Sequence, residues 1–136
     1  MDKTFTLNEF VFIAQHFLVI EEALFKNIHQ GKPGYKKELT NMLDRLERLE
    51  QWFEVRQVEY LVRIGIEFSM LEQEMDESLT VSADEELTHE QMLILKKQRL
   101  ALIKRNLRET QEVVKVKFLE LNGYALNLKL KAFAMF

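Results

Sequence analysis

Three histidines, at positions 16, 29 and 89, are the residues best suited to metal or acid-base chemistry in this chain. His89 and Glu90 begin a string like the zinc-protease motif, but Leu93 stands where the second His ligand would be. Glu86 and His89 form one Glu-x-x-His pair, whereas a di-iron helical bundle needs two such pairs and two further Glu. We therefore predict no metal site and no cofactor.

The remaining candidates for catalysis lack partners. His16 stands among apolar residues of a predicted helix, and no nucleophile or orienting acid can be named for it, so we interpret it as a partly buried structural residue. The chain has no Cys, which removes thiol nucleophiles and thiolate metal sites. The Gly31 to Gly34 segment lacks the spacing of a phosphate-binding loop. We predict no catalytic residue and no enzyme activity.

Charge is distributed unevenly, and this is the most informative feature of the composition. The span 67–90 has nine acidic residues and no Lys or Arg, whereas the span 96–108 has six basic residues and no acid. On a helix, four basic residues form an arc that could contact phosphates or a charged protein: Lys97, Lys104, Arg105 and Arg108. The basic span has no aromatic residue to stack on bases, and the net charge is −3. We therefore favour an internal or protein contact over nucleic acid.

Length and composition indicate which elements must position these residues. A chain of 136 residues with 47% apolar and 30% charged residues fits one folded, soluble domain over 1–136. Four Gly and one Pro are too few for a fold with many tight turns, which favours long helices. The longest apolar stretch, Phe10 to Ile20, is well short of the roughly 20 residues that span a bilayer. With no secretory signal pattern either, we expect a cytoplasmic protein without membrane contact.

The first predicted helix covers about residues 7–30. Thr6 and Glu9 have the spacing of a capping box, which satisfies backbone N–H groups where a helix begins. Apolar residues then recur on more than one face, which indicates a helix that is central in its bundle or covered by a partner. Gly31, as a left-handed residue, and Pro33 are expected to end the segment.

A long helix is predicted over about 35–77, followed by an acidic linker at about 78–88. Its heptad-like apolar repeat skips between Phe53 and Leu61, so we expect a kink near 55–60 or at Gly65. Thr88 and Gln91 form a second capping box, which predicts another helix over about 89–121.

The C-terminal region allows two interpretations. Asn122-Gly123 is a strong turn sequence, and it is expected to end the preceding helix and to leave a separate segment, 124–136. Alternating apolar residues around it allow a β-hairpin, with a possible third strand at 60–68. Because turn residues are scarce, we predict an all-α fold, an elongated antiparallel bundle of three to four helices. The alternative is an α+β fold with a C-terminal hairpin around Asn122-Gly123.

Without a catalytic constellation, we expect a non-enzymatic protein-protein interaction module, such as an adaptor, a chaperone-like subunit or an inhibitor of a larger protein machine. The last five residues are all apolar, and the first helix has surplus apolar faces, so we also expect a homodimer. The candidate apolar interface residues are Phe12, Val19, Phe133 and Phe136. The alternative function is a nucleic-acid-associated helical subunit that uses the basic face of residues 96–108.

Overall fold

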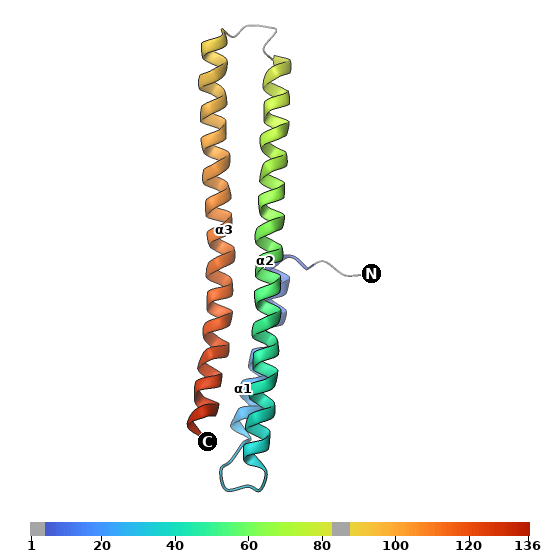
Figure 1. Cartoon of the computed structure of the whole chain (residues 1–136), viewed down its shortest axis with the longest axis vertical. Helices are drawn as coiled ribbons and strands as arrows, with labels where there is room; N and C mark the ends of the chain where they lie inside the picture. The colour runs from blue at the N-terminus through green and yellow to red at the C-terminus, as the bar shows by residue number, and fades with distance from the viewer. Residues whose placement is uncertain (1–4, 83–87) are drawn as a thin grey trace. The chain divides into compact units, whose positions relative to one another are not determined.

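The computed structural model describes residues 5–82 and 88–136, and within them the chain forms three α-helices (Figure 1). These are α1 (Leu7–Lys26), α2 (Tyr35–Ser82) and α3 (His89–Ala134). The described residues contain no strand. The prediction of an all-α helical bundle is confirmed, and the α+β alternative is wrong.

Both predicted capping boxes lie where α1 and α3 begin. The Thr6 hydroxyl accepts a hydrogen bond from the Glu9 backbone N–H at 3.2 Å. At the second box, the Thr88 hydroxyl accepts from the Gln91 N–H at 3.2 Å, and the Gln91 side chain accepts from the Thr88 N–H at 3.1 Å. These bonds satisfy N–H groups that have no partner within a helix, so the start of each helix could be predicted from sequence.

The end of α1 differs from its prediction. The helix ends at Lys26 rather than near residue 30, because Asn27 closes it with a backbone N–H bond to the Leu24 carbonyl at 3.1 Å. The glycine with a positive φ, +80°, is Gly34, directly before α2, and not Gly31. Glycine suits this conformation because it has no Cβ to clash with the backbone.

The predictions for the other two helix ends are also wrong. Helix α3 runs through Asn122-Gly123 to Ala134, so the predicted stop near 121, the separate segment 124–136 and the hairpin do not occur. One Gly inside a helix costs about 1 kcal/mol relative to Ala, less than is gained by burying even one large apolar side chain, at about 1.5–3 kcal/mol. Helix α2 includes residues 60–68 and continues to Ser82, past the predicted end at 77. The rest of the predicted acidic linker, up to 87, lies outside the described residues.

Contacts divide the chain into two compact units, which we describe separately. The first unit comprises Met1–Val58 and Lys115–Phe136, and the second comprises Glu59–Val114. The boundary in α2 falls within the skip in the apolar repeat between Phe53 and Leu61. The kink predicted near this point and the single domain stay predictions.

The first unit contains a three-helix core built around aromatic rings. The Phe10 ring of α1 lies 6.3 Å from that of Phe53 on α2 and 5.5 Å from that of Phe118 on α3, centroid to centroid. All three side chains are fully buried. Around them the remaining fully buried large side chains of this unit are Leu18, Leu39, Met42, Leu46, Leu121 and Leu128.

The second unit pairs part of α2 with part of α3, and the two segments run antiparallel (Figure 1). Among its described apolar side chains only Tyr60 and Val114 are buried, and the others are half-buried or exposed, because two helices cannot enclose a core as three do. Lys96 Nζ on α3 lies 3.0 Å from Asp76 Oδ1 on α2, an ion pair between the basic and acidic spans. The four basic residues singled out from the sequence take no part in this pair, so the internal contact expected for them stays a prediction.

Candidate functional site

The most unusual surface of the first unit is an apolar face of α1 that its own core does not cover. The helix buries Phe10, Ala14 and Leu18. The neighbouring stripe is exposed along about two helical turns, at Phe17, Ile20 and Leu24. An apolar stripe of this kind on a soluble helix is typical of a contact surface.

This stripe borders a groove between α1 and α2. A hollow of about 390 Å³ is lined by Phe17, Glu21, Arg45, Arg48, Leu49 and Trp52. The Phe17 and Trp52 rings meet edge to face with centroids 6.1 Å apart. A second hollow, of about 290 Å³, shares Arg45 with the first and continues to Leu24 and Asn41. We call the two hollows together the α1–α2 groove.

An ion pair forms part of the groove wall. Arg45 Nε donates to Glu21 Oε1 at 2.7 Å, and Arg45 Nη2 donates to Glu21 Oε2 at 3.1 Å. This two-point geometry holds the guanidinium in place, and the hydrogen bond to Glu21 raises the pKa of Arg45. Arg48 is exposed and makes no ion pair with any other described residue. The groove therefore offers aromatic and aliphatic walls together with one available cation.

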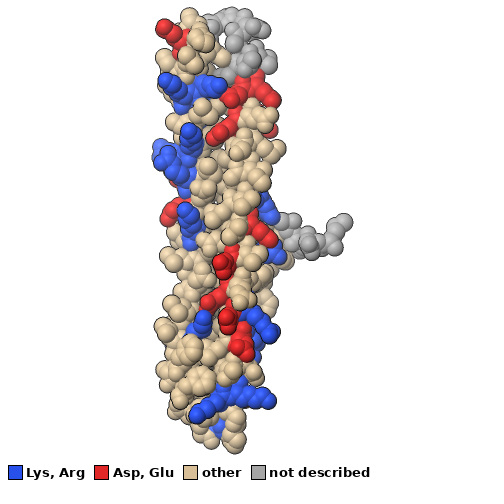
Figure 2. Space-filling model, in the orientation of Figure 1, with Lys and Arg blue, Asp and Glu red and all other residues tan. Residues whose placement is uncertain are grey.

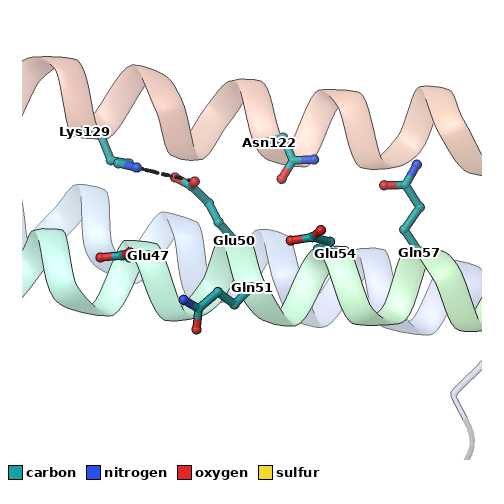
Figure 3. Close-up of a pocket in the computed structure, with 7 residues that line it drawn as sticks. All are labelled: Glu47, Glu50, Gln51, Glu54, Gln57, Asn122 and Lys129. Atoms are coloured by element: carbon teal, nitrogen blue, oxygen red, sulfur yellow. Dashed lines mark hydrogen bonds and ion pairs between the residues drawn. The ribbon is translucent and has the colours of Figure 1, made fainter.

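A second groove, between α2 and α3 of the first unit, is polar (Figure 3). Lys129 reaches across from α3 and places Nζ 3.2 Å from Glu50 Oε1 and 3.4 Å from Glu50 Oε2. Asn122 also points from α3 toward α2. Glu47 and Glu54 lie nearby on α2, but no three His, Asp or Glu side chains in the described ranges are grouped as a metal site requires. The Glu50–Lys129 pair links the two helices.

A hydrogen bond between α1 and α3 leads to a pH prediction. Tyr124 Oη donates to Glu22 Oε2, and this bond raises the pKa of Tyr124 to about 12 and lowers the pKa of Glu22. A tyrosine in the unfolded chain ionises near pH 10, so the bond contributes fully to folding below about pH 10. Its contribution is lost as the pH rises through about 12.

We expect a tyrosinate absorbance transition near pH 12 that disappears in Tyr124→Phe and moves toward pH 10 in Glu22→Gln. Circular dichroism at each pH checks that the helices are intact. A Tyr124 that titrated alike in the wild-type chain and in Glu22→Gln would contradict the effect of this bond.

The four basic candidates lie on α3 in the second unit, and all are exposed. Arg105 pairs with Glu109 of the same helix at 3.1 Å. In the part of the chain that the structure describes, Lys97, Lys104 and Arg108 make no ion pair. Figure 2 shows basic side chains gathered along this part of α3. The predicted basic face is thus present on the surface.

The predicted apolar interface residues are also exposed, but they do not line the groove. Phe12 and Val19 lie on α1, and Phe133 and Phe136 lie at the C-terminal end of α3. The interpretation of His16 as partly buried is wrong, because its side chain is exposed on α1. Glu86 of the Glu-x-x-His pair lies outside the described residues.

Sequence reasoning missed the groove because it did not single out Glu21, Arg45 or Trp52. A usable signal was Glu21, seven residues after Ala14 and therefore on the same helical face. A charged residue on a face that is otherwise buried usually has a paired partner. Arg45, the partner, is on the next helix, and this pairing cannot be read from periodicity within one segment.

The fold and these surfaces define a helical bundle with an exposed apolar groove. Comparisons with protein-family models, curated proteins and solved structures found no match. None of the described helices contains a stretch long and apolar enough to cross a membrane.

Proposed function

We propose that this chain is a non-enzymatic protein-protein interaction module that binds a helical segment of another protein in the α1–α2 groove. A role as an adaptor, a chaperone-like subunit or an inhibitor of a larger protein machine fits such binding. The observation that supports it is the continuous exposed stripe of Phe17, Ile20 and Leu24 beside a groove with Trp52 in its wall.

The chemistry of the groove indicates what its partner presents. An amphipathic helix docks in a groove by inserting apolar side chains spaced three and four residues apart. Phe17 and Trp52 offer aromatic surface for such anchors, and aromatic residues often dominate binding energy at interfaces. Arg48 can pair with a carboxylate through two parallel hydrogen bonds. We therefore expect a partner helix with an apolar face and at least one Asp or Glu beside it.

The test combines capture with reconstitution. A photo-crosslinking amino acid at position 20 labels the partner in native lysate, and mass spectrometry identifies it. The purified partner is then titrated into the chain by calorimetry. We expect Ile20→Glu and Arg48→Glu each to raise Kd about tenfold or more, because one places a charge on the apolar stripe and the other reverses the charge that attracts the carboxylate.

Gln15→Glu is the matched control, because Gln15 is exposed on α1 and lies outside both the apolar stripe and the groove. Its Kd should equal that of the wild-type chain. Equal Kd values for all the variants would overturn the proposal.

Three exposed basic residues that make no ion pair within the described ranges favour the alternative function, a nucleic-acid-associated subunit: Lys97, Lys104 and Arg108. Phosphate contacts of this kind weaken as salt rises. The alternative predicts that nuclease treatment or raised salt abolishes capture, and that reversing these three charges also abolishes it. It predicts no effect of Arg48→Glu on capture. These results together would replace the first proposal with the alternative.

A further inference from the structure

The C-terminal part of α3 carries an apolar repeat that the fold of the chain does not use. Six residues follow the alternating three- and four-residue spacing of a coiled coil without interruption: Val116, Leu119, Gly123, Leu126, Leu130 and Phe133. All five large members are exposed. We call these six residues the α3 seam. All of them belong to the first unit.

The seam is separate from the face of α3 that builds the core. In the first unit that core face consists of Phe118, Leu121, Ala125, Leu128 and Ala132. On the face that Figure 2 shows, few charged side chains lie on the C-terminal part of α3. An exposed apolar face of at least two heptads therefore runs along a helix that already has its intramolecular contacts.

No contact among the described residues requires a glycine at position 123, in the middle of the seam. A Cβ added there would meet nothing within 4 Å, and its backbone is helical, so neither close packing nor a special φ requires glycine. Glycine inside a helix costs about 1 kcal/mol relative to Ala. A helix from another molecule that approaches the backbone closely would explain a glycine at this position.

We propose that the α3 seam is the interface of a parallel homodimer, in which it packs against the same seam of a second copy. Charge complementarity identifies the occupant. In the heptad notation abcdefg, the seam residues occupy the core positions a and d. In a parallel coiled coil, the residue at g, just before a, lies opposite the residue at e, five positions later, in the partner helix. By this rule Lys115 faces Glu120 of the partner subunit, and Asn122 faces Asn127 of the partner subunit. Lys129, which pairs with Glu50 of its own chain, faces Ala134 of the partner subunit. Two-fold symmetry makes each pair twice.

An antiparallel dimer lacks this complementarity. In that orientation g positions face g positions and e positions face e positions. Asn122 then lies near Lys129 of the partner subunit, and Glu120 lies near Asn127 of the partner subunit. Neither contact is an ion pair. This proposal does not depend on the α1–α2 groove, because the two surfaces share no residue.

Light scattering after size exclusion tests the interface. Leu126 lies on the seam and Val19 lies on α1, and each side chain is 53% exposed. Leu126→Glu and Val19→Glu therefore each place a charge at an equally exposed apolar position. We expect twice the chain mass of 16.2 kDa for the wild-type chain and for Val19→Glu. Leu126→Glu should run as a monomer, with its dimer Kd raised about 100-fold or more, because it buries an unpaired charge.

A wild-type chain that stays monomeric at about 100 μM would overturn the proposal, since that concentration lies far above the micromolar Kd of a modest interface. Dissociation by Val19→Glu but not by Leu126→Glu would place the interface on α1 instead. Circular dichroism confirms that each variant keeps its helices.

Three further variants test the parallel orientation. Lys115→Glu alone should weaken the dimer, and Lys115→Glu combined with Glu120→Lys should restore it, which a merely structural role of either residue would not produce. The chain has no native Cys, so Val116→Cys places one thiol at one end of the seam. In a parallel dimer the two thiols lie opposite each other and oxidise to a disulfide. In an antiparallel dimer they lie about 27 Å apart, too far for a bond, and that result would refute the orientation.

Discussion

Replacing Phe10 with Ala should lower the free energy of unfolding by about 3–5 kcal/mol, the usual cost of truncating a fully buried Phe. Phe10 is buried where α1, α2 and α3 of the first unit meet. Its ring centroid lies 4.7 Å from that of Trp52 and 5.5 Å from that of Phe118, and the Phe118 ring is stacked on it. The substitution removes these ring contacts and leaves a cavity that backbone on three sides cannot fill. Urea unfolding followed by circular dichroism measures the loss.

Phe12→Ala is the matched control, because Phe12 is on the same helix but 72% exposed. Its truncation should change the unfolding free energy by no more than about 0.5 kcal/mol, as is usual for surface positions. If Phe10→Ala does not fold, Phe10→Leu keeps most of the buried volume, and we expect it to fold with a smaller loss. Equal losses for Phe10→Ala and Phe12→Ala would show that the three-helix core is not organised around Phe10. All comparisons need one protein concentration, because the proposed dimer would add to apparent stability.

Local features made the starts of the helices predictable, because each capping box is complete within four residues. Thr6 with Glu9 and Thr88 with Gln91 satisfy their own backbone N–H groups whatever the rest of the chain does. The helix ends depend on a competition between local turn preference and the burial of apolar side chains. At Asn122-Gly123 the turn preference lost to the burial of Phe118, Leu121 and Leu128 on one continuous helical face. The apolar period of this segment indicates one continuous helical face, and a single glycine inside a packed helix does not interrupt it.

The functional surfaces were less accessible from sequence, because periodicity identifies apolar stripes without saying which one is buried. On α1, Phe10 and Phe17 belong to the same three-and-four repeat, yet Phe10 is buried and Phe17 is exposed. The position of α2 decides between them, through contacts such as Glu21 with Arg45 that join separate helices. The predicted basic and apolar surface residues are exposed as expected, but the grooves between helices depend on tertiary packing and had no local signature.

Replacing Arg45 with Met should destabilise the chain, because it leaves the Glu21 carboxylate buried without its partner. The Glu21 side chain is only 8% exposed, whereas that of Arg45 is 43% exposed. Breaking a fully buried pair from one side costs about 3–5 kcal/mol. Water reaches the Arg45 side of this pair and screens it, so we expect a smaller loss of about 2 kcal/mol. Urea unfolding at neutral pH measures it.

The double variant, Glu21→Leu with Arg45→Met, separates the cost of an orphaned charge from the value of the pair. It leaves no buried charge, and its unfolding free energy should return to within about 1 kcal/mol of the wild-type value, since apolar replacement of a buried pair is often nearly neutral. Glu21→Leu alone should cost less than Arg45→Met alone, because the exposed guanidinium can be hydrated where the buried carboxylate cannot. Arg48→Met is the control on the same helix, since Arg48 makes no ion pair in the described ranges. Equal stability losses for Arg45→Met and Arg48→Met would mean that the Glu21–Arg45 pair does not hold α1 against α2.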